Sequence, residues 1–158
     1  MKRHQPGIRA IVNTVGGEPL VRPDLIQCGR EIIRNGFYRG MVSNAMLLDG
    51  EMMKELSRNG LCSLSIDIDG LPDEHNWLRH SQISFDRAYN AIAHIRKAPH
   101  LVWYVITCVN LRNFPHLDEL KRMLIEAGVQ RWRCSQLFQW AAYRLAKPQP
   151  IPFNSGNS

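Results

Sequence analysis

Short apolar runs alternate along this chain with amphipathic helical patterns, and this alternation restricts the fold more than any other feature. Strands are predicted for five apolar runs: 11–15, 37–42, 61–68, 101–106 and 129–138. Between them apolar residues recur at helical spacing, and Gly36, Gly60 and Gly128 predict helix ends. Repeated strand and helix units predict an α/β fold with a parallel sheet, either part of a barrel or doubly wound.

Four residues predict where helices begin, because proline suits a first helical turn and short polar residues cap it. They are Pro23, Asp49, Ser84 and Pro115. The 158 residues suit one domain, which we expect over 1–138. Repeated prolines and a polar end predict a disordered tail over 139–158.

The ends of the chain contain neither a targeting signal nor a membrane segment that we recognise. No window approaches the about 18 uninterrupted apolar residues of a membrane span. The start MKRHQPGIR is not followed by the apolar run of a secretory signal. We therefore expect a cytoplasmic protein without a membrane partner.

The net charge of +6 comes from the two ends of the chain. Residues 10–130 contain 13 Lys/Arg and 14 Asp/Glu, so this stretch is nearly neutral. The basic ends lack the interleaved aromatic and basic residues of a single-strand groove. A basic nucleic-acid-binding protein is therefore an alternative that the composition does not favour.

The cysteines and histidines do not predict a metal site. Cys28, Cys62, Cys108 and Cys134 are 34, 46 and 26 residues apart, which matches neither zinc pairs nor a compact disulfide framework. We expect them to be reduced core thiols. The two histidines at 75 and 80 are five residues apart, whereas helical metal pairs are separated by four.

Glycine and short polar residues follow four of the predicted strands. These segments are 16–19, 43–44, 67–70 and 107–110. Function in parallel α/β folds lies at the carboxyl ends of the strands, so these segments are the candidate site. In the first of them two glycines permit a close backbone approach, and Glu18 presents a carboxylate that could pair with an ammonium group. Each segment alone also suits an ordinary turn or helix cap.

Taken in order, five segments resemble the radical SAM superfamily, most closely its peptide-modifying branch, whose members often carry a SPASM cluster domain. They are GGEPLVRPDL, GMVSNAMLL, LSIDIDGLPDEHNWLR, TCVNLRN and GVQRWR. The resemblance covers about 14–138 and implies a partial (β/α)6 TIM-type barrel of about five βα units. It also implies S-adenosylmethionine bound against a 4Fe–4S cluster, whose electron cleaves the cofactor to start radical chemistry.

The resemblance also implies the cofactor-binding residues. In the family the glutamate of the GGEP segment receives the methionyl amino group, which is the role implied for Glu18. The cofactor-binding residues so implied are Gly16, Gly17, Glu18, Pro19, Ser43, Asn44, Asp67 and Arg79. Arg79 matches a position that commonly faces the cofactor carboxylate, and a surface salt bridge to Asp73 or Glu74 is the alternative.

The sequence departs from a complete radical SAM site at one of these residues and in its missing cluster loop. Asp67 stands where the family usually has Ser, which would set two negative charges close together at the cofactor carboxylate. We expect Asp69 to support the turn into Gly70. Residues 1–158 contain no CxxxCxxC loop, so no cluster ligands are predicted, and the first strand of the barrel is absent as well.

These departures lead to the hypothesis of a gene fragment whose two ends are incomplete or read out of frame. By resemblance we expect a radical SAM domain protein, and we expect this chain alone to be enzymatically inactive. In the intact family member the partners would be a peptide substrate and a reductant. A binding module for S-adenosylmethionine or a peptide, without redox activity, is the main alternative.

Overall fold

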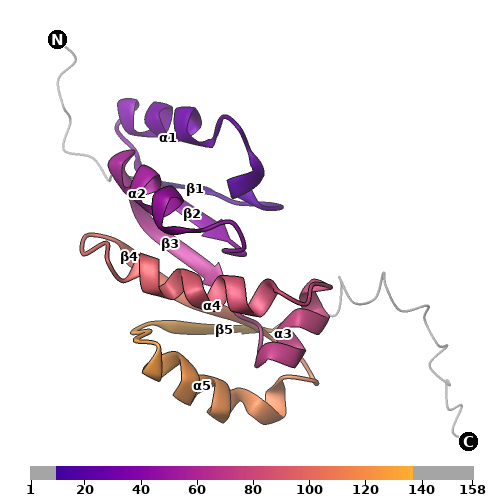
Figure 1. The fold of residues 1–158 in the computed structure, drawn as a ribbon. Helices are drawn as coiled ribbons and strands as arrows, with labels where there is room; N and C mark the ends of the chain where they lie inside the picture. Colours follow the sequence, from indigo (N-terminus) through magenta and orange to yellow (C-terminus); the bar gives the residue numbers. More distant parts are fainter. Residues whose placement is uncertain (1–9, 137–158) are drawn as a thin grey trace, which may run out of the picture.

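Five strands form one parallel sheet in the computed structural model, which describes residues 10–136 (Figure 1). They lie in chain order and are β1 Ile11–Thr14, β2 Tyr38–Ser43, β3 Leu61–Asp67, β4 Val102–Val109 and β5 Trp132–Gln136. Each strand pairs in parallel with the next along the chain. Within the described residues β1 and β5 have one neighbour each, so the sheet is open, as the predicted partial barrel requires.

Helices connect successive strands. They are α1 Leu25–Arg34, α2 Gly50–Arg58, α3 Pro72–Arg79, α4 Ser84–Ile95 and α5 Leu117–Glu126, with short 3-10 turns η1 Pro19–Val21 and η2 Phe114–His116. Gly36, Gly60 and Gly128 take positive φ just after α1, α2 and α5, which confirms the predicted helix ends. Asp49 caps α2 as predicted, because its side chain accepts a hydrogen bond of 2.8 Å from Met52 N–H.

The core lies between the helices and one face of the sheet (Figure 1). Met41, Leu64 and Val105 come from three adjacent strands and are fully buried with Leu56 of α2 and Ile92 of α4. The alternate residues of the strands point to the opposite face. That face is more open, since Val102 is 52% exposed and the Arg133 guanidinium stacks on the Tyr104 ring at 3.9 Å.

Two predictions about local structure are wrong, and one helix was not predicted. Ser84 is the first residue of α4 rather than its cap, and its hydroxyl contacts His75 instead of the helix N–H groups. Helix α3 was not predicted, because its buried residue is His75 while Trp77 is 52% exposed, so it lacks an apolar stripe. Cys134 is exposed on the edge strand β5 and is not a core thiol.

The other predicted boundaries agree to within a few residues. Pro115 lies in η2, one turn before α5 begins. The predicted end of the last strand, beyond 136, and the predicted tail 139–158 lie outside the described residues. None of the helices in the described range is long and apolar enough to cross a membrane.

Candidate functional site

The Glu18 carboxylate joins the ends of the first two strands. Its Oε1 accepts hydrogen bonds from Leu20 N–H at 3.0 Å and from the Ser43 hydroxyl at 2.8 Å. Its Oε2 accepts one from the Asn44 backbone N–H at 2.7 Å. Three residues predicted from separate segments therefore converge. A carboxylate offers about four acceptor positions, so at least one stays available to a further donor.

The turn before Glu18 depends on its glycines for conformation. Gly16 and Gly17 have φ of +91° and +57°, a region that side chains disfavour. A Cβ atom added at either would meet nothing within 4 Å, so crowding is not the reason for glycine there. Pro19 follows as the first residue of η1, with Glu18 as its cap. The turn thus presents open backbone beside the carboxylate.

The loop after β2 is held by its own side chains. The Ser43 hydroxyl, which donates to Glu18, accepts a hydrogen bond of 2.9 Å from Ala45 N–H. The Asn44 side chain accepts one of 3.0 Å from Met46 N–H, which closes a short turn. Asn44 therefore offers its backbone to Glu18 and uses its side-chain oxygen within the loop.

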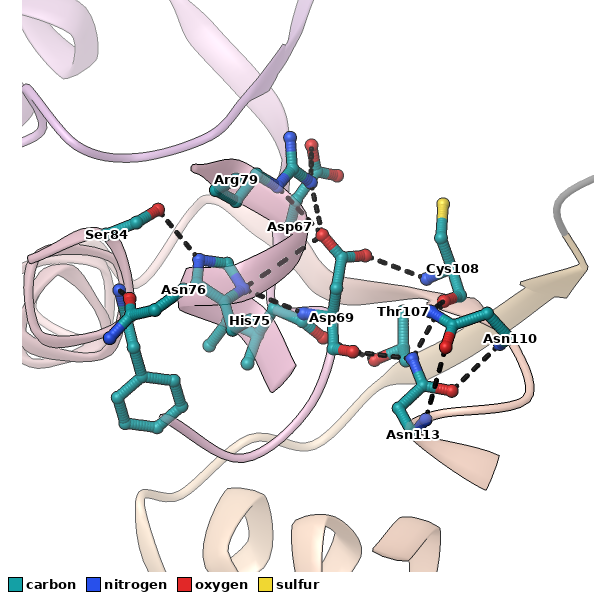
Figure 2. Close-up of polar contacts among 12 residues, drawn as sticks. Asp67, Asp69, His75, Asn76, Arg79, Ser84, Thr107, Cys108, Asn110 and Asn113 are labelled. Carbon is teal, nitrogen blue, oxygen red and sulfur yellow. Dashed lines mark hydrogen bonds and ion pairs between the residues drawn. The ribbon is translucent and has the colours of Figure 1, made fainter. Parts of the chain in front are cut away.

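Arg79 lies between two carboxylates at the end of β3 (Figure 2). Its Nε donates to Asp69 Oδ2 at 2.8 Å, its Nη2 contacts the same oxygen, and Nη2 lies 3.0 Å from Asp67 Oδ2. The alternative of a surface salt bridge to Asp73 or Glu74 is wrong, since α3 turns Arg79 toward the strand end. Within residues 10–136, Nη1 of Arg79 has no hydrogen-bond partner.

The two aspartates differ in burial. Asp69 is 1% exposed, and its Oδ1 accepts a hydrogen bond of 2.9 Å from Cys108 N–H at the end of β4. Asp67 is 23% exposed. Asp69 is therefore a fixed link between two strand ends, which is more than the support of a turn that the sequence predicted. Asp67 is the carboxylate on the accessible side.

Burial and charged neighbours together shift the pKa values of Asp67 and Arg79. Burial raises the pKa of Asp67, and the neighbouring Asp69 and Glu18 carboxylates raise it further, against the opposing effect of Arg79. Burial lowers the pKa of Arg79, but Asp69 and Asp67 outweigh burial and leave it above its ordinary value. An isolated ion pair would lower the pKa of its acid, so Asp67 is not fully compensated by its partner.

His75 supports Asp69 from inside the protein. It is fully buried, and its Nδ1 accepts a hydrogen bond of 3.0 Å from Asp69 N–H. Nε2 must then carry the proton and donate to the Ser84 hydroxyl at 2.9 Å. Burial lowers the pKa of His75 to about 4, so the ring is neutral at physiological pH. His75 is a positioning residue and not a metal ligand.

Asn113 and Thr107 fix the next loop (Figure 2). The Asn113 side-chain amide donates to the backbone carbonyls of Asp69 and Cys108. The Thr107 hydroxyl donates to the Ile68 carbonyl at 2.6 Å and accepts from Trp132 Nε1 at 2.8 Å. Sequence reasoning identified 107–110 as a strand end but did not assign Asn113, His75 or Ser84 to the site. The pairing of His75 with Arg79 four residues later, on one helical face, was the available signal.

Parallel βα units in chain order, with a polar site at the carboxyl ends of the strands, define this protein as a partial βα barrel of the kind that binds cofactors at that end. The family model of the radical SAM superfamily matches residues 1–134. The chain belongs to the radical SAM superfamily, whose members use S-adenosylmethionine and a 4Fe–4S cluster.

Curated relatives and solved structures agree with this family. The chain is 32% identical over 114 residues to the AdoMet-dependent heme synthase of Methanosarcina barkeri, covering 72% of this chain and 32% of that protein. It is 26% identical over 145 residues to the PqqA peptide cyclase of Bradyrhizobium diazoefficiens, covering 88% of this chain and 37% of that one. The chain thus spans about a third of the length of these relatives.

Two solved structures are similar in fold. AnSMEcpe with bound AdoMet and a peptide matches with a TM-score of 0.69 at 18% identity, over 81% of this chain and 38% of that chain. SuiB of Streptococcus suis bound to its precursor peptide SuiA matches with a TM-score of 0.69 at 15% identity, over 84% of this chain and 30% of that chain. Both likenesses support the partial barrel.

The described residues fit one of the two family cofactors. S-adenosylmethionine carries an ammonium and a sulfonium, and Glu18 retains acceptor capacity beside the open turn of Gly16 and Gly17. The cluster does not fit, because no group of three or more His, Cys, Asp or Glu within 10–136 is arranged to hold a metal. The four cysteines of the sequence are also too dispersed to form one loop.

Proposed function

We propose that this chain supplies the S-adenosylmethionine-binding part of a radical SAM site. The observation that supports the proposal is the convergence of Glu18, Ser43 and Asn44 at one strand edge, with acceptor capacity remaining on Glu18. Glu18 receives the methionyl ammonium group, while Ser43 and the Asn44 N–H orient the carboxylate. Gly16 and Gly17 leave room for the ligand, and Pro19 starts the turn that places Glu18.

Bound S-adenosylmethionine supplies the radical precursor in this family, and these 158 residues supply only its binding. Residues 10–136 hold no cluster site, so we propose that the chain by itself does not cleave the cofactor reductively. We further propose, from the peptide-modifying relatives, that the intact protein acts on a peptide in the cytoplasm with a separate reductant. A binding module without redox activity is the second candidate.

Calorimetry with S-adenosylmethionine tests the binding role. We expect Glu18→Gln to weaken binding about 10- to 100-fold, because a hydrogen bond to a charged group contributes about 1.5–3 kcal/mol. Glu51→Gln is the matched control, since Glu51 is exposed on α2 and pairs only with Lys54 in the described structure. No binding by the wild-type chain, or equal binding by Glu18→Gln, would contradict the proposal.

Anaerobic incubation with iron and sulfide tests the second part. We expect no 4Fe–4S signal in optical or spin-resonance spectra of this chain alone. A stoichiometric cluster signal would overturn the proposal that residues 1–158 cannot assemble the metal centre.

A further inference from the structure

The candidate site carries more negative than positive charge. Glu18, Asp67 and Asp69 face one another across the ends of β1 and β3, and Arg79 is the cation that contacts two of them. Cys108 of β4 also faces this cluster, and burial raises the pKa of its thiol, which keeps it neutral. The described part of the site has three carboxylates and one guanidinium, so it is net negative and favours the cationic groups of a ligand.

Of the two aspartates in the cluster, Asp67 is the one that a ligand can reach. Asp69 is held by Arg79 and Cys108 N–H and is 1% exposed, so it cannot move without breaking buried contacts. Asp67 is 23% exposed, and within the described residues Arg79 Nη2 is its one ion-pair partner. Figure 2 shows Asp67 and the Arg79 guanidinium together at the edge of the network, away from His75.

A ligand carboxylate that approached Arg79 would therefore meet Asp67. It would have to displace Asp67 from Nη2 or share the guanidinium with it at close range, and like charges side by side at an interface disfavour binding. Burial is the main cause of the raised pKa of Asp67, and the nearby Asp69 and Glu18 carboxylates add to it, so Asp67 already has two carboxylates close by before any ligand arrives. Glu18 has no such conflict with an ammonium group.

We propose that Asp67 determines ligand specificity at this site by occupying Arg79 and disfavouring a ligand carboxylate, so that S-adenosyl sulfonium compounds are selected by their cationic groups. This inference rests on the proposed S-adenosylmethionine site. It makes Asp67 the residue that sets the difference in affinity between S-adenosylmethionine and its decarboxylated form, which lacks only the carboxylate.

Calorimetry with these two ligands on wild type, Asp67→Asn and Asp73→Asn tests the inference. Asparagine keeps the size of Asp67 and an acceptor for Arg79 but removes the charge. Asp73 is an exposed carboxylate at the start of α3 and provides the same charge change away from the site. We expect Asp67→Asn to raise the affinity for S-adenosylmethionine relative to the decarboxylated form by about tenfold or more. Asp73→Asn should leave the ratio unchanged.

The wild-type chain provides a second measurement that needs no variant to fold. Burial raises the pKa of Asp67, so lowering the pH increases its protonated fraction and should shift the affinity ratio in the same direction. Binding of both ligands with a ratio that neither substitution nor pH changes would overturn the inference and leave the proposed function standing. Binding of neither ligand by any form would overturn both.

Discussion

Protonation of His75 should make the stability of this protein fall steeply below neutral pH. The ring is fully buried, and its Nδ1 already accepts a hydrogen bond from Asp69 N–H. A proton on Nδ1 would replace this acceptor with a second donor facing the same N–H group. The folded protein therefore resists protonation of His75, whereas the unfolded chain does not.

The magnitude follows from the two pKa values. The folded pKa of His75 is about 4, and the ordinary value is 6.5. Between these values the unfolded state binds the extra proton, so stability is full above pH 6.5 and falls as the pH is lowered toward 4. The total loss is about 3 kcal/mol, of which about 2 kcal/mol appears between pH 7 and pH 5.

The assay is urea unfolding at pH 7 and pH 5, followed by circular dichroism. His75→Asn keeps an oxygen acceptor for Asp69 N–H and removes the titration, so its stability should depend on pH less than that of wild type by about 2 kcal/mol. His100→Asn removes an exposed histidine and should keep the wild-type dependence. The raised pKa of Asp67 acts in the opposite direction but equally in all three proteins. Equal pH dependence in wild type and His75→Asn would refute the reasoning.

Two further predictions concern the stability of helices α1 and α2. Gly29→Ala should lower the free energy of unfolding by about 1–3 kcal/mol, because a Cβ there would overlap the buried Arg39 guanidinium. Ser57→Ala, at an exposed position of α2, should leave the stability nearly unchanged in the same urea assay. Asp49→Ala should lower the free energy of unfolding by about 1 kcal/mol, because it removes the side-chain cap on Met52 N–H. Asp49→Asn keeps an acceptor and should retain most of this stability. Equal stability of the two variants would contradict the capping role.

The βα order was predictable because each strand and helix has its own apolar period. The same reasoning placed Glu18 near Ser43 and Asn44, since the carboxyl ends of parallel strands meet at one edge, and the hydrogen bonds confirm that convergence. The choice between a barrel and a doubly wound sheet needed the strand order. That order is a property of long-range pairing and is invisible to local periodicity.

The polar interior was not predictable by the same means. Helix α3 buries His75 and directs Arg79 toward the strand end, so hydrogen bonds replace the apolar stripe by which helices are recognised. Asn113 is 44 residues from Asp69 in the sequence, and only the folded chain brings the two together. Arg39 was hidden within an apolar strand, where its guanidinium donates to the carbonyls of Leu25 and Asn59.

Two aspartates separated by one residue do different work because of where β3 ends. Asp67 is the last residue of β3 and Asp69 follows two residues later, and the Arg79 guanidinium contacts both carboxylates. Asp69 lies beyond the strand, where β4, α3 and the Asn113 loop surround it. Its carboxylate accepts hydrogen bonds from β4 and α3, and its backbone bonds to His75 and Asn113. Asp67 is 23% exposed, and within residues 10–136 Arg79 is its one ion-pair partner. A change of charge at Asp67 should therefore change which ligand binds more tightly, while Asp69 keeps the surrounding loops in place.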